Sequence, residues 1–434
     1  MPRKKAAKAA TKVDLQPKKF NLFESDIVDS TQEALAALNA RKKNRPVTLR
    51  SLSEVPRYLL NHGFFALDMT FGTRGFRGKT AIEFIGGEGI GKTTFIFTLL
   101  GGLMKNNQSP VLYVNTEGDN KLPNKQRIMR CLDTDPKIAE RILNVLEIDT
   151  GRELRRTTEY IEDFIHTTRK YLNDRGAEDV PIVVVIDTLS KMMSPGEAAG
   201  VLDDGEDNKK AKELGGGSNF EFAKLMHAWC RQLPSLLEAN NVLLIAVSHQ
   251  NQKIDMSGFG SPMSAETSAG YNKNKYGGKA LDQNAVMQCT IKRIGFAKNS
   301  KGEPIGHKVQ LRVVKSSVGA DNSTLDYVLK TRDFDDHEGY QELALDFSEG
   351  LANAFAEQKL LGTTVVRKRY TSDELGVSGV TAQEFMETLQ SRPDILAKLG
   401  HELKIEGYTS EEVAALESYG EDDTPEENED AQEE

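Results

Sequence analysis

Short continuous apolar runs recur through the middle of the chain, and helix-like stretches separate them. Apolar runs of this length, bounded by polar residues, predict buried strands. The predicted strands cover residues 80–85, 111–115, 181–187, 242–247, 286–291 and 308–314. The predicted helices cover residues 95–100, 151–172 and 220–239. Buried strands that alternate with helices are typical of an α/β fold. Its mainly parallel sheet is covered by helices on both faces and binds ligands at the carboxyl ends of the strands.

The chain ahead of this core is predicted to form two small pieces. Residues 1–21 are basic and rich in alanine, which favours a disordered arm. Within residues 22–58, the sequence STQE precedes an alanine- and leucine-rich run and predicts a helix. Residues 45–49 predict an edge strand because Pro46 interrupts a β-branched run. This helix and strand have two interpretations: a cap on the core, or an element that packs on a neighbouring subunit.

The core is predicted to span residues 59–345, and a small C-terminal domain is predicted over residues 346–419. Helix-like spacing within residues 371–399 predicts that this domain is helical there. Residues 420–434 contain no core-forming side chains and are predicted to form a disordered acidic tail. The tail has two interpretations, a competitor of DNA for basic surfaces or a solubility device.

Charge and cysteine content restrict the class of protein. The net charge is −9, and the nine acidic residues of the tail account for all of it, so the remainder is about neutral. Basic residues gather at 3–8 and 253–293, so the charge balance does not exclude nucleic acid. No apolar run approaches the roughly 20 residues of a membrane span, and the basic start lacks the apolar segment of a secretory signal. The distant cysteines Cys131, Cys230 and Cys289 predict buried thiols in a reducing, cytoplasmic compartment.

A glycine-rich stretch follows the first predicted strand and fits the nucleotide-binding spacing G-x-x-x-x-G-K-[ST]. The strand before it and the helix after it are the context that this motif requires. Glycines let backbone N–H groups converge on phosphate oxygens, and the helix N-terminus adds positive charge. Lys92 is predicted to reach the terminal phosphates of ATP, and Thr93 to bind Mg²⁺. The predicted nucleotide-binding residues are Gly86, Gly87, Glu88, Gly89, Ile90, Gly91, Lys92, Thr93 and Thr94.

Polar residues end three other predicted strands. Asp187 is predicted to hold Mg²⁺ through water, and Glu117 to activate the attacking water. His249 or Gln250 is predicted to contact the γ-phosphate, and the sequence leaves both open. Each of these residues alone is more often an ordinary strand-end polar group. Together with the glycine-rich motif at one edge of a parallel sheet, they predict a site that hydrolyses ATP.

Two long glycine-rich stretches, residues 192–218 and 251–283, interrupt the core. Stretches of this length in a compact domain are typically functional loops or disordered segments. The second alternates lysines with aromatic residues, which suits the phosphates and bases of single-stranded nucleic acid; an ordinary mobile surface loop is the alternative. The residues concerned are Lys253, Phe259, Tyr271, Lys273, Lys275, Tyr276 and Lys279.

From about residue 31 to residue 340, the chain resembles the RecA family of DNA recombinases, of bacterial or bacteriophage type. The resemblance includes the glycine-rich motif with its Glu88 and paired Thr93 and Thr94. It also rests on residues 62–68, 75–79, 113–117, 184–188, 277–281 and 291–295.

The resemblance implies a RecA-type P-loop ATPase core that forms helical filaments on single-stranded DNA. Such filaments hydrolyse ATP at subunit interfaces and catalyse homologous pairing and strand exchange with duplex DNA. Residues 31–49 would then drive polymerisation, and residues 346–419 would bind duplex DNA. Arg367, Lys368 and Arg369 form a basic cluster in that domain, and an ordinary solvated face is the alternative interpretation of it. A loading protein and a single-strand-binding protein are further implied partners. The resemblance also assigns Lys315 to the ATP site of the neighbouring subunit. It adds five glycines to the DNA-binding set: Gly215, Gly216, Gly217, Gly277 and Gly278.

Two positions depart from the family's pattern. The family's γ-phosphate sensor is usually a glutamine after an asparagine, whereas this strand ends Ser248-His249-Gln250, so that His249 holds the aligned position. The second of the family's two interfacial lysines is Ser317 here. The alternatives are a ring-forming replicative helicase and a non-motor ATPase with the same core. The short region ahead of the core argues against the helicase, and the basic, aromatic second stretch argues against the non-motor ATPase.

Overall fold

The protein is described here from a computed structural model. It describes residues 59–118, 125–132, 137, 139, 143–147, 153–202, 217–249, 280–298, 301–317, 319–330 and 345–421. The predicted basic arm, the N-terminal helix and edge strand, and nearly all of the acidic tail lie outside the described residues. Most of the second glycine-rich stretch also lies outside them.

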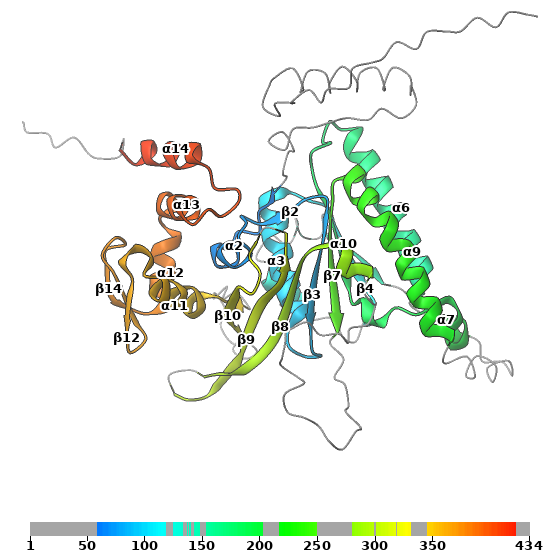
Figure 1. The fold of residues 1–434 in the computed structure, drawn as a ribbon, viewed down its shortest axis with the longest axis horizontal. Helices are drawn as coiled ribbons and strands as arrows, with labels where there is room; N and C mark the ends of the chain where they lie inside the picture. Colours follow the sequence, from blue (N-terminus) through cyan, green and yellow to red (C-terminus); the bar gives the residue numbers. More distant parts are fainter. Residues whose placement is uncertain are drawn as a thin grey trace, which may run out of the picture. The chain divides into compact units, whose positions relative to one another are not determined.

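A nine-stranded sheet forms the centre of the described chain, in the order β11-β10-β9-β8-β3-β7-β6-β4-β5 (Figure 1). Strands β8, β3, β7, β6, β4 and β5 run parallel, while β8 to β11 pair antiparallel. The predicted α/β fold with a mainly parallel sheet is therefore confirmed. The strands are β3 (Thr80–Gly86), β4 (Val111–Asn115), β5 (Leu143–Glu147), β6 (Ile182–Asp187), β7 (Val242–His249), β8 (Ala285–Lys298), β9 (Pro304–Ser316), β10 (Thr324–Lys330) and β11 (Leu345–Asp346).

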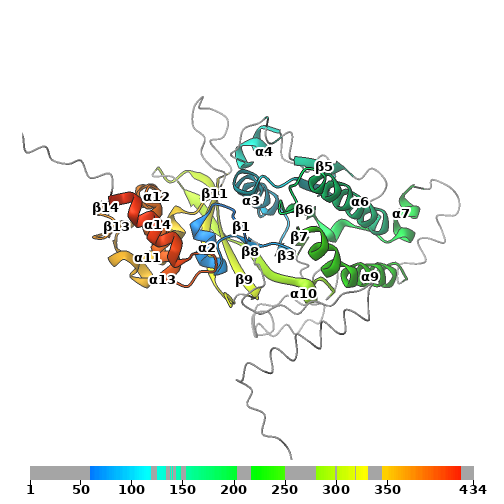
Figure 2. The same ribbon diagram turned by 90° about the horizontal axis from the view of Figure 1, so that it is seen from above.

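Helices cover both faces of the sheet because successive strand residues point to opposite sides. Val111 and Tyr113 of β4 join the apolar core that contains α3 and α4, whereas Leu112 and Val114 join the core that contains α6 and α9. Figure 2 shows α3 beside α4 on the sheet. The four helices are α3 (Lys92–Asn107), α4 (Lys125–Leu132), α6 (Leu154–Asn173) and α9 (Gly217–Asn240).

Strands β8 and β9 extend beyond their predicted limits and form a long antiparallel ribbon. The prediction stopped at residue 291 because the apolar run ends there, and the next residues, Lys292 and Arg293, are exposed. Strand pairing continues past that point because backbone hydrogen bonds do not require apolar side chains. Strands β5 and β10 and helix α4 were not predicted.

The first glycine-rich stretch was predicted as one loop over residues 192–218, and this is wrong at both ends. Helix α7 (Pro195–Leu202) occupies its beginning, and α9 starts at Gly217, which therefore lies in a helix. A capping box at Ser194 and Glu197 stabilises the N-terminus of α7. The backbone N–H of Ser194 donates to Glu197, and that of Glu197 donates to the Ser194 hydroxyl. Pro195 suits the first helical position.

The C-terminal module combines helices with a three-stranded sheet. The prediction that residues 371–399 are helical is wrong for residues 371–380. Residues 373–376 form the turn between β13 and β14, closed by the Gly376 N–H, which donates to the Asp373 carbonyl. Gly376 has a φ of 66°, which favours glycine. The module comprises α11 (Ser348–Gln358), β12 (Thr364–Val366), β13 (Arg369–Ser372), β14 (Val377–Val380), α12 (Ala382–Gln390), α13 (Pro393–Glu402) and α14 (Ser410–Glu421).

The module contacts the core through a partly buried polar seam. Arg77 of β2 (Phe76–Arg77) makes two hydrogen bonds to Glu406, at 2.7 and 2.9 Å. Arg74 donates to both carboxylate oxygens of Glu412 at 2.6 Å. Backbone bonds from Arg74 to Glu406 and from Glu406 to Gly72 reinforce the contact. The module is therefore anchored on the segment that leads into β3.

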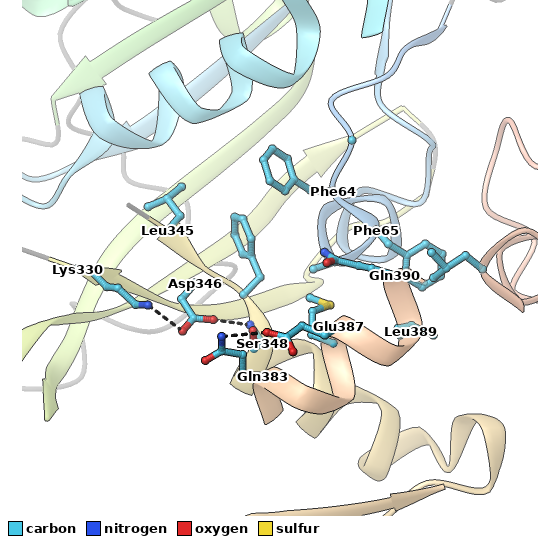
Figure 3. A pocket seen from close by; sticks show the side chains of 15 residues that line it. Phe64, Phe65, Lys330, Leu345, Asp346, Ser348, Gln383, Glu387, Leu389 and Gln390 are labelled. Atoms are coloured by element: carbon cyan, nitrogen blue, oxygen red, sulfur yellow. Dashed lines mark hydrogen bonds and ion pairs between the residues drawn. The ribbon is translucent and has the colours of Figure 1, made fainter. Parts of the chain in front are cut away.

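A cavity of about 460 Å³ lies between α2 (Phe65–Phe71), the β10–β11 edge and α12 (Figure 3). Phe64 and Leu345 contribute apolar walls, and Lys330 lies at its rim, 3.8 Å from Asp346. The cavity is a gap in the packing between core and module, and its lining includes none of the predicted nucleotide-binding residues. Among the described helices, none is both long and apolar enough to cross a membrane.

Candidate active site

The glycine-rich motif forms the turn between β3 and α3, as predicted. Strand β3 ends at Gly86, and α3 begins at Lys92. Gly89 and Gly91 have φ angles of 71° and 92°, which other residues rarely adopt. A Cβ atom on Gly86 would lie 2.5 Å from the carbonyl oxygen of Ile291, so that position has no room for a side chain. The loop geometry thus accounts for the glycines at positions 86, 89 and 91. Of the other motif residues, Glu88 is exposed, Gly87 and Ile90 are partly buried, and Thr94 is buried.

Lys92 folds back over this loop. Its Nζ donates to the carbonyl oxygens of Gly86 at 3.1 Å and Gly87 at 2.6 Å, and it lies 3.2 Å from His249 Nδ1. The side chain is buried, with 5 % of its surface exposed. These partners of Lys92 are uncharged backbone carbonyls and a ring nitrogen. The ammonium group can therefore exchange them for the charged oxygens of a bound phosphate. From β8, Arg293 also reaches the loop and donates to the Gly89 carbonyl at 3.1 Å.

The hydroxyl of Thr93, at the start of α3, contacts the carboxylate of Asp187, at the end of β6. The Thr93 hydroxyl donates to Asp187 Oδ2 at 2.7 Å, and the Tyr113 hydroxyl donates to the same oxygen at 2.7 Å. Asp187 is 3 % exposed. Burial raises the pKa of Asp187, and the hydrogen bonds from Tyr113 and Thr93 oppose that shift. A hard divalent cation prefers oxygen ligands of this kind, so Thr93 and Asp187 fit Mg²⁺, with Asp187 acting through water.

Glu117 and His249 form the third contact of the site. His249 Nε2 lies 2.6 Å from Glu117 Oε1. Because Nδ1 of the same ring accepts from Lys92, the ring proton belongs on Nε2, which then donates to Glu117. The Glu117 backbone N–H donates to Asn115 Oδ1 at 3.1 Å, and this fixes the turn that follows β4. The structure thus places His249 between Lys92 and Glu117, whereas Gln250 lies outside the described residues.

Hydroxyl groups hold the ends of three strands together. Thr116 donates to the Thr188 carbonyl at 2.6 Å and accepts from the Thr188 N–H at 2.7 Å, which joins β4 to β6. Thr188 in turn donates to the Val247 carbonyl at 2.6 Å, and the His249 N–H donates to the Ser190 hydroxyl at 2.8 Å, which joins β6 to β7. These contacts fix the carboxyl ends of the strands that carry Glu117, Asp187 and His249.

A buried polar chain leads away from His249. The carboxylate of Glu83, on β3, accepts from the Ser248 hydroxyl and from the Gln288 amide, both at 2.7 Å. The Gln288 amide also lies 2.6 Å from Asp282, in α10 (Ala280–Asn284). Lys315, predicted to act in a neighbouring ATP site, donates to the Asp282 carbonyl at 2.5 Å within its own chain. The polar chain therefore ends at α10, which begins inside the second glycine-rich stretch, so the prediction of a loop over residues 251–283 is wrong for residues 280–283.

The sequence predictions missed part of the site. Tyr113 and Arg293 lie in segments that resemble the family, but the sequence assigns neither of them a role in the site, and Ser190 lies outside those segments. Of the predicted nucleic-acid-binding residues, the structure describes Gly217 alone, which lies in α9. The others lie outside the described residues: Lys253, Phe259, Tyr271, Lys273, Lys275, Tyr276, Gly277, Gly278, Lys279, Gly215 and Gly216.

Comparison with known proteins places the site in a wider context. No family model matches the chain. Over 374 residues, 85 % of this chain and 83 % of the relative, it is 25 % identical to Protein RecA of Corynebacterium aurimucosum. The chain is similar to RecA proteins. Protein RecA of Rickettsia canadensis is 26 % identical over 61 % of this chain and 64 % of its own length.

A plant relative extends the comparison. The mitochondrial DNA repair protein recA homolog 3 of Arabidopsis thaliana is 23 % identical over 62 % of this chain. The chain spans about half of that relative's length, 52 %, and just under two-thirds of the Rickettsia protein. These identities support a RecA-like family and a P-loop ATPase core, in agreement with the sheet and the glycine-rich motif.

Proposed function

We propose that this protein is an ATP-dependent DNA recombinase. It would form helical filaments on single-stranded DNA, pair that strand with a homologous duplex and exchange the strands. The observation that carries the proposal is the convergence of Lys92, Thr93, Asp187, Glu117 and His249 at the carboxyl ends of adjacent parallel strands. The similarity to RecA proteins, one of which is named a DNA repair protein, supports the choice among P-loop activities.

The side chains of the site divide the work of ATP hydrolysis. Lys92 and the loop N–H groups bind the phosphates, and Thr93 and Asp187 hold Mg²⁺, which neutralises developing negative charge when bound. Glu117 accepts a proton from the attacking water. The water oxygen bonds to the γ-phosphorus as the bond from that phosphorus to the bridging oxygen breaks. His249 keeps Glu117 oriented, because its Nε2–H donates to the carboxylate.

His249 would couple nucleotide binding to DNA binding. Phosphates that attract Lys92 compete with its contact to His249, and only Gln250 separates His249 from the proposed DNA-binding stretch. At the C-terminal end of that stretch, α10 is held by Gln288 and Lys315. ATP would therefore favour the DNA-binding state through contacts that differ between the two states. Lysines and aromatic residues of the stretch would bind phosphates and stack on bases.

The sheet offers a surface for self-association. β5 is the last strand in the sheet order, and within the described residues its outer edge pairs with no strand. Val145 on β5 is 44 % exposed. A predicted edge strand such as residues 45–49 of a second copy could extend the sheet by pairing there. We therefore propose that residues 31–49 drive filament assembly, with Lys315 placed near the neighbour's ATP site.

Negative-stain imaging of the full chain with ATP, Mg²⁺ and single-stranded DNA tests this function. Long helical filaments are expected for the wild type. They should be absent for Lys92→Ala, because the phosphates lose their buried cation. Closed rings would indicate a helicase instead, and particles without assembly would favour a non-motor ATPase. A loading protein or a single-strand-binding protein would alter the rate of assembly, not the form of the polymer.

A further inference from the structure

Tyr113 is a buried tyrosine whose hydroxyl belongs to the candidate active site. It lies in the middle of β4 with 1 % of its surface exposed. Its ring stacks on Phe97 of α3 at 4.7 Å between ring centres, with 23° between the planes. The ring is therefore fixed by packing, and the hydroxyl is held 2.7 Å from Asp187 Oδ2.

The two oxygens of Asp187 have different surroundings. Oδ2 accepts from both Thr93 and Tyr113, whereas no hydrogen bond from the described residues reaches Oδ1. A carboxylate with both donors on one oxygen has a preferred rotation about its Cβ–Cγ bond. Oδ1 is then the oxygen left for a water molecule of hydrated Mg²⁺.

We propose that Tyr113 is a positioning residue that fixes the rotation of Asp187 and so strengthens the binding of Mg²⁺ with the nucleotide. The inference rests on the proposed nucleotide site and adds a residue to which the sequence analysis assigns no role. Tyr113 acts through Asp187 and does not contact the phosphates itself. Loss of the hydroxyl leaves a buried carboxylate with the single donor Thr93, and such a carboxylate is both less solvated and free to exchange its oxygens.

The test compares Tyr113→Phe with a matched control, Tyr327→Phe. Tyr327 belongs to the same apolar core, is 3 % exposed and has a buried hydroxyl without a hydrogen-bond partner among the described residues. Both variants lose one buried hydroxyl, but only Tyr113→Phe loses a donor to Asp187. The affinity for mant-ADP, a fluorescent nucleotide, is measured for each full-length protein with Mg²⁺ and with EDTA.

Mg²⁺ should strengthen mant-ADP binding in the wild type and in Tyr327→Phe. In Tyr113→Phe this gain should fall about 10- to 100-fold, the value of one hydrogen bond to a buried charged group. The affinity in EDTA should not change, because Lys92 and the loop are intact. If Mg²⁺ strengthens mant-ADP binding by Tyr113→Phe as much as by the wild type, the inference is wrong but the proposed nucleotide site stands. A wild type that does not bind mant-ADP, or binds it without any Mg²⁺ gain, overturns the proposed nucleotide site and this inference with it.

Two further variants show whether Tyr113 acts through Asp187. In an Asp187→Asn background, Tyr113→Phe should produce no further loss of the Mg²⁺ gain; a second, additive loss would contradict the inference. Replacement of Tyr113 by 4-aminophenylalanine keeps a donor at the same place and should restore most of the gain. This replacement also provides a test if Tyr113→Phe does not fold. A variant that has the amino donor but shows no Mg²⁺ gain would overturn the inference.

Discussion

His249 Nε2 lies 2.6 Å from Glu117 Oε1, so a residue predicted to contact the γ-phosphate lies directly against the proposed catalytic base. Both side chains are mostly buried, with 14 % and 17 % of their surfaces exposed. The other ring nitrogen of His249 faces Lys92 at 3.2 Å. One imidazole therefore links the phosphate-binding cation to the base.

His249→Ala should lower ATP turnover by about 100-fold while it changes nucleotide affinity only a few-fold. The reason is that Glu117 loses the donor that orients it, and misplacement of a catalytic group by about 1 Å can cost about that much. The measurement is kcat for ATP hydrolysis together with mant-ADP affinity. His249→Gln is the control, because an amide can donate to Glu117 and should retain more turnover than alanine. Wild-type kcat in His249→Ala would show that the contact has no catalytic role.

A buried pair beside the C-terminal seam predicts opposing effects of pH on stability. His62 Nε2 lies 3.5 Å from Asp68 Oδ1, and both side chains are buried. Burial lowers the pKa of His62 from 6.5 to about 3, and burial raises the pKa of Asp68 from 3.8 to about 7. Between about pH 4 and 6.5, the folded state thus binds fewer protons at His62 and more at Asp68 than the unfolded state does.

These two effects can be separated by substitution. His62 makes stability rise with pH in this window, and Asp68 makes it fall, so they offset each other in the wild type. Relative to wild type, Asp68→Asn should show stability that rises more steeply with pH, and His62→Gln stability that falls. The change in slope is at most about 1.4 kcal/mol per pH unit in either case. Urea unfolding from pH 4 to 6.5 measures the slopes; curves parallel to wild type for both variants would disprove the assignment.

The Arg77–Glu406 contact should contribute measurably to docking of the C-terminal module. The pair is partly buried, with 24 % and 17 % side-chain exposure, and two guanidinium donors share one carboxylate oxygen. A double-mutant cycle with Arg77→Met and Glu406→Gln should give a coupling free energy of about 1 kcal/mol. The exposed pair Arg155–Glu159 on α6 is the control and should couple by less than about 0.5 kcal/mol. Equal coupling in both pairs would argue against the seam as an anchor.

Removal of residues 420–434 should tighten duplex DNA binding, most strongly at low salt. The tail carries nine carboxylates on a chain whose remainder is about neutral. Exposed ion pairs are individually weak, but a tether keeps the competing charges at high effective concentration. The offset between the two proteins should shrink as salt rises because screening weakens both interactions. Single-strand affinity, helped by base stacking, should change less. Salt titrations that coincide at every ionic strength would leave the tail as a solubility device.

The parts of the fold that the sequence predicts correctly are those with local signals. Strand β4 begins and ends where its apolar run does, and the glycine spacing locates the turn before α3. The extension of β8 past Lys292 depends on pairing with β9, a partner that hydrophobic periodicity in one segment cannot reveal. Likewise, residues 373–375 have helical spacing, but a hairpin turn at Gly376 prevails there.

The same distinction holds within the site. Glu117 and Asp187 follow apolar strands, so their meeting at one sheet edge could be predicted from topology. Tyr113 could not be predicted as a partner of Asp187, because one position in an apolar strand cannot show which residue lies across the sheet. The sequence left open whether His249 or Gln250 contacts the γ-phosphate. The structure brings His249 to Lys92 and Glu117, whereas Gln250 lies outside the described residues.

The rate of ATP hydrolysis by wild type and Glu117→Gln, each with and without single-stranded DNA, tests the central claim most directly. Wild type should hydrolyse ATP in the presence of Mg²⁺, and single-stranded DNA should increase the rate. Glu117→Gln should bind mant-ADP with near wild-type affinity but hydrolyse ATP about 10²- to 10⁴-fold more slowly, because it lacks the general base. Wild-type turnover in Glu117→Gln, or a wild-type rate that DNA leaves unchanged, would contradict an ATPase site that acts with DNA.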